Sequence, residues 1–221
     1  MSIFPTISGQ IEEYDIIVIG HLRWNRYFGE GEATAPRGQP STCTSTLIRG
    51  CDAEGVPYAL LVDPTLRSSA SDYYFDLNRR TGLHARDITH CFVTHEHMDH
   101  QAGLNYFPNA VWYAAPPVAE ALRSSEYIDG DRVVSVEGEF LPGVCAVPLP
   151  GHTYGLHGVA FVSQGLHCIV AGDAVMTRHH FARETTEFQK DAEMAAETIR
   201  HLKESADVVI PGHDNLIIVR P

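Results

Sequence analysis

The sequence lacks any apolar run that approaches the roughly 18 residues of a membrane-spanning helix. Residues 1–5 carry neither a basic segment nor a long apolar one, so we expect no signal peptide. The five cysteines are an odd number, and no two of them form a Cys-x-x-Cys pair. Reduced and mostly buried thiols are therefore expected. Together these absences predict a cytoplasmic protein that does not span a membrane.

Basic residues are also scarce, because 16 Lys and Arg stand against 28 Asp and Glu and leave a net charge of −12. This balance opposes nonspecific binding to nucleic acid and to anionic membranes, and it favours a small-molecule partner. No internal repeat or low-complexity tract is visible. With 221 residues and 44% apolar residues, the chain can bury a sizeable core. We expect residues 1–221 to form one domain, in an oligomeric state that the sequence leaves open.

A histidine-rich segment directly follows the short apolar run 91–93. It contains His95, His97, Asp99 and His100. Two residues separate His95 from His97, so an extended chain points both imidazoles the same way. Three imidazoles and a carboxylate suit zinc, or iron or manganese. The chain has 13 histidines, so a chance polar cluster is the alternative. The position straight after a strand favours a metal site.

Three more residues of metal-ligand type follow apolar runs, each directly after a glycine. His152 comes after the predicted strand 144–149, Asp173 after the hairpin 159–170, and His213 after the predicted strand 207–210. A carboxylate at the end of a buried strand is costly unless it is paired or bound to a metal. We therefore expect these three side chains to join the histidine-rich segment.

Residues 94–100 resemble the His-x-His-x-Asp-His motif of the metallo-β-lactamase-fold hydrolases, and the later Gly-His and Gly-Asp elements extend the resemblance over about residues 44–213. The resemblance implies an α/β protein with a four-layer αββα sandwich. It also implies two divalent metal ions per chain, zinc in the first place, with iron or manganese as alternatives. Divided as in that family, one ion takes His95, His97 and His152, the other takes Asp99, His100 and His213, and Asp173 bridges the two.

The same resemblance implies a metal-dependent hydrolase that uses a metal-bridging hydroxide on a small ester, lactone, thioester or lactam. Asp99 would be catalytic, orienting the nucleophile and passing a proton to the leaving group. Two alternatives of the same fold stay open. One is a mononuclear iron dioxygenase, and the other is a metal-dependent nuclease or phosphodiesterase, which the acidic charge disfavours. Flavin-linked diiron members carry Glu where His97 stands, which argues against that branch.

Four residues are candidates for substrate contact. Trp24 lies in the irregular segment 21–41, which either walls the substrate pocket or packs as a surface loop. Tyr154, two residues after His152, either donates to an oxyanion or is simply exposed. His179 and His180 either contact an anionic substrate group or belong to a solvated loop.

The sequence also predicts two helices and a role for Asp63. The pattern predicts a helix over 69–80, capped by Ser69 and closed by Gly82. A second helix is predicted over 186–203, where Thr186 and Gln189 fit a capping box and Phe188 begins an apolar stripe. Asp63 follows a predicted strand, and it either orients a metal ligand or caps a turn.

Overall fold

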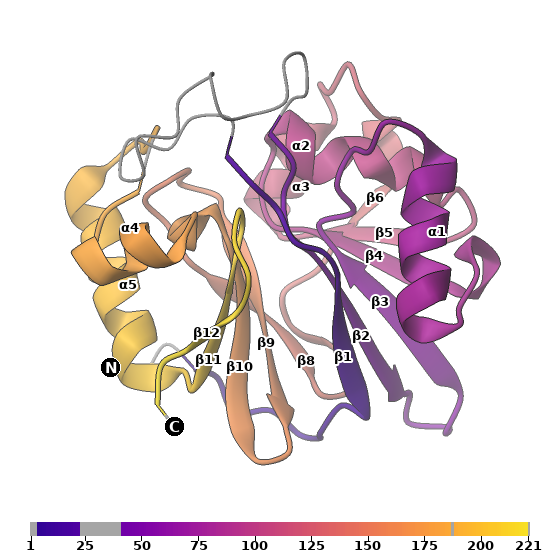
Figure 1. Cartoon of the computed structure of the whole chain (residues 1–221), viewed down its shortest axis with the longest axis horizontal. Helices are drawn as coiled ribbons and strands as arrows, with labels where there is room; N and C mark the ends of the chain where they lie inside the picture. Colours follow the sequence, from indigo (N-terminus) through magenta and orange to yellow (C-terminus); the bar gives the residue numbers. More distant parts are fainter. Residues whose placement is uncertain (1–3, 23–40, 187, 221) are drawn as a thin grey trace.

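Two six-stranded sheets pack face to face, with helices on their outer sides (Figure 1). The computed structural model describes residues 4–22, 41–186 and 188–220. The first sheet contains, in spatial order, β1 (Glu13–Val18), β2 (Ser45–Cys51), β3 (Pro57–Val62), β4 (His90–Val93), β5 (Val111–Ala114) and β6 (Val133–Ser135). The second contains β12 (Ile217–Ile218), β11 (Val208–Pro211), β10 (Leu166–Gly172), β9 (His157–Ser163), β8 (Val144–Pro148) and β7 (Gly138–Leu141). The predicted αββα sandwich is confirmed.

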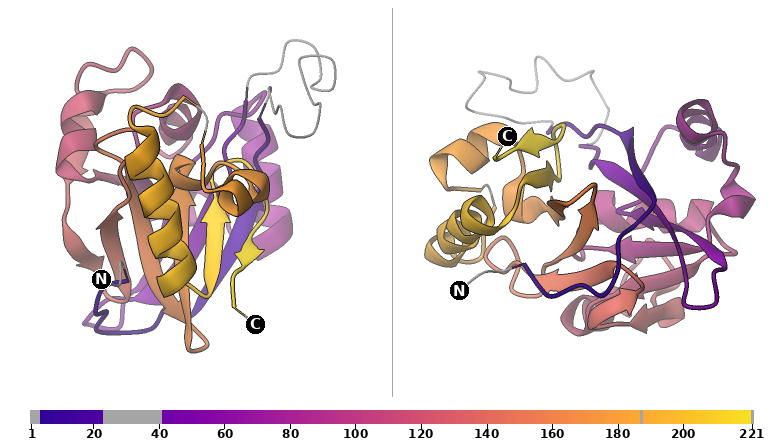
Figure 2. Two further views of the ribbon diagram at one scale, coloured as in Figure 1. Left: turned by 90° about the vertical axis from the view of Figure 1, so that its left-hand side faces the viewer. Right: turned by 90° about the horizontal axis from the view of Figure 1, so that it is seen from below.

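The helices of the first part of the chain lie on the first sheet, and those of the second part lie on the second sheet (Figures 1 and 2). On the side of the first sheet lie α1 (Ala70–Thr81), α2 (Met98–Gln101) and α3 (Pro116–Leu122). On the side of the second lie α4 (Arg178–Arg183) and α5 (Ala192–Ser205). In the described part of the chain, short 3₁₀ turns join the elements, namely η1 (Ala85–Asp87), η2 (Ala102–Tyr106), η3 (Gly130–Arg132) and η4 (Asp173–Val175). Within the described residues, no helix is both long and apolar enough to span a membrane.

The central strands are apolar on both faces because each face meets another layer. In β3, Leu60 and Val62 point into the core between the sheets, while Leu61 faces the outer core beneath α1. In β10, Val170 points inward and Ile169 outward toward α5. Burying one such side chain contributes about 1.5–3 kcal/mol. The alternation therefore gives three apolar cores, one between the two sheets and one between each sheet and its helices, and these cores hold the four layers together.

The first predicted helix is confirmed, together with both of its ends. The Ser69 side chain accepts a hydrogen bond from the Asp72 amide at the start of α1. Gly82 ends the helix in a left-handed conformation, with φ of 75°. Tyr73 and Leu77 are fully buried against the first sheet.

The second predicted helix, 186–203, begins later than expected. Phe188 has φ of 53°, which no right-handed helix accommodates. The amide of Asp191 donates to the carbonyl of Gly151 rather than within a helix, and the Asp191 side chain caps α5. The Thr186 hydroxyl does not cap a helix, because it is hydrogen-bonded to the main chain that follows β10. Tertiary hydrogen bonds therefore replace the predicted capping box.

Other differences are smaller. Residues 178–183, predicted as irregular, form the short helix α4, whose first turn is capped by the Thr177 side chain. The strands β7 and β12 were not predicted either. Both are short and lie at the edges of the second sheet, where few of their side chains are buried. Their sequences therefore carry no clear apolar pattern.

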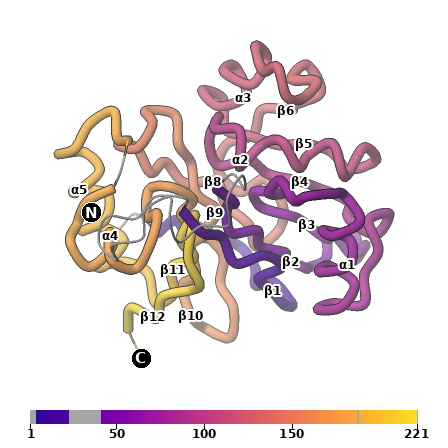
Figure 3. Tube along the Cα trace, turned by 45° about the horizontal axis from the view of Figure 1, so that its top comes forward, coloured from indigo at the N-terminus to yellow at the C-terminus, as the bar shows by residue number. Residues whose placement is uncertain are grey.

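The ends of four strands bring the ligand-type residues to one region between the sheets. In the first sheet the histidine-rich segment follows β4, and in the second His152, Asp173 and His213 follow β8, β10 and β11. Figure 3 shows α2 and the ends of both sheets from above. The candidate site therefore joins the two halves of the chain.

Candidate metal centre

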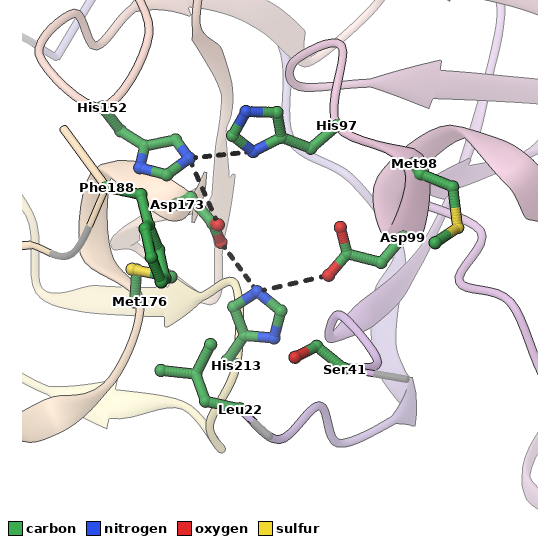
Figure 4. Close-up of a pocket in the computed structure, with 10 residues that line it drawn as sticks. All are labelled: Leu22, Ser41, His97, Met98, Asp99, His152, Asp173, Met176, Phe188 and His213. Carbon is green, nitrogen blue, oxygen red and sulfur yellow. Dashed lines mark hydrogen bonds and ion pairs between the residues drawn. The ribbon is translucent and has the colours of Figure 1, made fainter. Parts of the chain in front are cut away.

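One group of ligand-type atoms gathers around one oxygen of Asp173. His97 Nδ1 lies 3.1 Å from His152 Nε2. His152 Nε2 and His95 Nε2 lie 3.5 Å and 3.8 Å from Asp173 Oδ2. Figure 4 shows His97, His152 and Asp173 converging on one side of the cavity. The ligand atoms of all four residues lie within 4.8 Å of one another.

A second group faces the other oxygen of the same carboxylate. His100 Nε2 lies 3.3 Å and His213 Nε2 lies 3.2 Å from Asp173 Oδ1. Asp99 Oδ2 lies 3.6 Å from His213 Nε2. Asp99, His100 and His213 again meet within 4.8 Å. The two oxygens of Asp173 are thus divided between two groups of side chains, so all seven sequence-predicted ligand residues come together.

The hydrogen bonding of these atoms fits a bound cation. His95 Nε2, His100 Nε2 and Asp173 Oδ1 are buried without a hydrogen-bond partner of normal geometry among the described residues. Leaving a buried polar atom unsatisfied costs about 1–3 kcal/mol. His97 Nδ1 and His152 Nε2 also face each other at 3.1 Å, a contact in which one of the two nitrogens carries the proton when no ion is bound. Nitrogen and oxygen donors of this kind are the ligands that Zn²⁺ binds, so the residues fit divalent metal ions.

Asp63 holds His100 in its orientation. The carboxylate is fully buried, and its Oδ2 lies 2.8 Å from His100 Nδ1. Oδ1 accepts the amide of Thr94, and Oδ2 also accepts the Thr94 hydroxyl, both at 2.8 Å. A proton held on Nδ1 leaves the Nε2 lone pair of His100 free to face Asp173. Of the two roles that the sequence left open, Asp63 has the orienting one.

Two other imidazoles are held in the same way. His213 Nδ1 lies 3.0 Å from the carbonyl of Thr42, and His95 Nδ1 lies 3.1 Å from Thr94 Oγ1. Each contact leaves Nε2 directed toward Asp173. Sequence reasoning missed Thr42, because it lies about 170 residues before His213 in the chain and no local pattern marks it.

The pKa values of His95 and Asp173 are both lowered, but for different reasons. Burial lowers the pKa of His95 well below its ordinary value, and the neighbouring imidazoles lower it further, so His95 is neutral as a metal ligand must be. Burial raises the pKa of Asp173, but His213 and His100 lower it more, so this pKa lies well below the usual range. Asp173 is therefore an ionised carboxylate deep in the protein, which requires cationic partners. Burial lowers the pKa of His213, but Asp173 and Asp99 raise it above its ordinary value, so without an ion this imidazole is one such partner.

A cavity of about 350 Å³ opens onto the candidate centre. Its lining among the described residues combines five ligand-type side chains with one serine and four apolar side chains (Figure 4). These are His97, Asp99, His152, Asp173 and His213, then Ser41, and then Leu22, Met98, Met176 and Phe188. The size suits a small molecule.

The predicted substrate-contact residues that the structure describes are not part of this lining. Trp24 lies outside the described residues. Tyr154 is 67% exposed and is not among the lining residues. His180 is fully buried in α4, with Nδ1 2.8 Å from Thr177 Oγ1, and His179 on the same helix does not line the cavity. The solvated loop that the sequence suggested for His180 is therefore wrong.

Comparison with known proteins agrees with the fold. A family model described as the metallo-beta-lactamase superfamily matches residues 38–213. The N-acyl homoserine lactonase AiiA of Bacillus thuringiensis subsp. kurstaki is 24% identical over 201 residues, which cover 84% of this chain and 77% of the lactonase. Metallo-beta-lactamase domain-containing protein 1 of Xenopus laevis is 28% identical over 175 residues, covering 76% and 69%. A solved structure of a B. thuringiensis AiiA mutant with N-decanoyl-L-homoserine bound at its active site superimposes with a TM-score of 0.64 at 18% identity, covering 93% and 94%.

Proposed function

Since the chain belongs to the metallo-beta-lactamase superfamily, we propose that it is a dinuclear, zinc-dependent hydrolase that opens a lactone or a related small carbonyl compound. That it is a metal-dependent hydrolase follows from the family and its lactonase relatives. One observation carries the dinuclear part of the proposal. The Oδ2 of Asp173 faces the imidazoles of His95 and His152, while its Oδ1 faces those of His100 and His213.

These distances support the ligand assignment that the resemblance implies. His95, His97 and His152 would hold one ion, and Asp99, His100 and His213 would hold the other. Asp173 would contribute to both. When bound, two divalent ions supply a water-derived nucleophile at neutral pH and polarise the carbonyl that is attacked. The chain supplies the positions of these ligands through Asp63 and the main chain behind them.

Asp99 has a second role in this proposal. Both Asp99 and Asp173 line the cavity, but the side chain of Asp99 is 19% exposed whereas Asp173 is almost completely buried. Asp99 can therefore meet both the attacking oxygen and the departing one. We assign it to orient the nucleophile by hydrogen bonding, to take the proton that the nucleophile loses on attack, and to pass that proton to the leaving oxygen of the opened ring.

The substrate class rests on the cavity and on the relatives. A volume of about 350 Å³ suits a small ester, lactone, thioester or lactam better than a polymer. Several Bacillus relatives are named N-acyl homoserine lactonases, which favours a lactone among these four. The net charge of −12 opposes the polyanionic substrate of a nuclease.

Metal analysis of protein purified without added metal, followed by titration with zinc, tests the proposal. We expect two equivalents per chain at saturation, together with hydrolysis of lactones in a panel that also holds a thioester, a β-lactam and RNA. His84→Ala, which removes an exposed imidazole before β4, should retain both equivalents. Saturation at one equivalent would contradict the dinuclear centre, and native iron at that single site would favour the dioxygenase.

A further inference from the structure

Phe188 lies between α4 and α5 in an unusual conformation. Its side chain is 73% exposed, yet it lines the cavity beside the candidate centre. Its φ of 53° is left-handed, which is uncommon for a bulky residue. Surrounding structure must hold such a conformation in place.

Hydrogen bonds after Phe188 tie the chain to the loop that carries His152. The amide of Lys190 donates to the carbonyls of Gly151 and His152 at 2.9 Å and 3.1 Å. The amide of Asp191 also donates to the carbonyl of Gly151, at 3.1 Å. The main chain beside Phe188 is therefore fixed relative to one candidate ligand.

A hydrogen bond before Phe188 ties the chain to a second candidate ligand. The hydroxyl of Thr186, itself buried, donates to the carbonyl of Asp173 at 3.2 Å. Because Thr186 and Lys190 are both held by hydrogen bonds, a molecule that packs on the Phe188 ring meets a side chain already positioned at the cavity. A contact with a side chain that is already held in place loses less binding free energy to the ordering of the protein.

The ring belongs to an apolar wall. Figure 4 shows Phe188 and Met176 on the same side of the cavity as His152, with Met98 beside Asp99. Among the described residues, no lysine or arginine lines the cavity. A charged substituent packed against Phe188 and Met176, away from the metal ligands, would therefore lose hydration without gaining an ionic partner, whereas an apolar one would gain contacts.

We infer that Phe188 is a specificity-determining residue, which packs against an apolar chain attached to the reacting carbonyl group of the substrate. The inference rests on the proposed hydrolase function, and it adds the chemical class of the substituent. The ring takes no part in bond breaking. It should therefore influence the binding of substrates with a chain and leave the chemistry at the metals unchanged.

Hydrolysis of 4-nitrophenyl acetate and 4-nitrophenyl octanoate by the metal-loaded enzyme tests the role of the ring. We expect kcat/KM to be higher for the octanoate ester. Phe188→Ala should lower kcat/KM for octanoate about tenfold, mainly through KM, and for acetate less than about twofold. Phe188→Leu should restore most of the preference. Because the ring is exposed, its removal should not change the melting temperature.

Phe75→Ala is the matched control, since Phe75 is 66% exposed on α1 and does not line the cavity. Its preference between the two esters should equal that of the wild type. Calorimetric binding of octanoate and acetate gives a readout that does not need turnover, and Phe188→Ala should weaken only octanoate. An unchanged octanoate-to-acetate ratio in Phe188→Ala, in both assays, overturns the inference. Failure of the metal-loaded wild type to hydrolyse any ester or lactone rejects the proposed function instead, and the binding ratio still decides the role of Phe188.

Discussion

Replacing Asp63 by Asn should weaken the binding of one metal ion while leaving the shape of the site unchanged. The carboxylate accepts from the Thr94 amide at Oδ1, and at Oδ2 it meets both the Thr94 hydroxyl and His100 Nδ1. An amide keeps only one acceptor oxygen. If its NH₂ faces the Thr94 amide, two donors oppose each other. If it faces His100, the imidazole must move its proton to Nε2, the atom directed at Asp173.

The magnitude follows from the position of Asp63 behind the ligand. Removing a partner that orients a metal ligand typically costs 10–100-fold in affinity, or about 1.4–2.7 kcal/mol at 1.4 kcal/mol for each factor of ten. The affected ion is the one assigned to His100, Asp99 and His213. We therefore expect one of two equivalents to bind about 10–100-fold more weakly, while the ion held by His95, His97 and His152 binds nearly as before.

Competitive titration of zinc against a chromogenic chelator measures both affinities. Asp207→Asn is the matched control, because Asp207 precedes β11 whereas the ligand His213 follows it, and its side chain accepts the His167 amide and pairs with Arg220. It should bind both ions as the wild type does. Folding of each variant is checked by circular dichroism. Two equivalents of wild-type affinity in folded Asp63→Asn would refute the orienting role.

Two further substitutions separate the ligand groups. Asp99→Ala should retain about one zinc per chain and lose hydrolysis, because the three-imidazole group does not include Asp99; two bound ions and normal turnover would reject its assignment. Gly212→Ala should weaken the binding of both ions, because a Cβ at this position would overlap Asp173 Oδ1. Zinc titration measures this loss of affinity. Gly9→Ala, where a Cβ meets only ordinary contacts, serves as its control, and unaltered zinc binding by Gly212→Ala would contradict the packing argument.

The ligand-type residues could be predicted because each directly follows an apolar strand. Strand ends at one edge of a sheet converge, so His152, Asp173 and His213 needed no tertiary information beyond the order of strands. α1 could also be predicted from local signals, because Ser69 and Gly82 each form their capping contacts with the adjacent turn of the helix.

The remaining features depend on contacts between distant parts of the chain. The start of α5 was mispredicted because the Asp191 amide is bonded to Gly151, a partner that no local pattern reveals. Asp63 could not be assigned from sequence, since its role depends on where His100 lies. The apolar wall was missed for the same reason. Phe188 has a helical spacing in sequence but lies outside any helix.

The division of the ligands between the sheets links metal occupancy to the assembly of the molecule. Residues 95–100 come before the β6–β7 connection, and His152, Asp173 and His213 come after it. Neither half of the chain therefore contains a full set of ligands for either proposed ion. Each bound ion would add its binding free energy only to the state in which the two sheets are docked in the correct register. Metal content would then report how correctly the chain has folded, because a chain with misaligned sheets would bring the same seven side chains too far apart to share an ion.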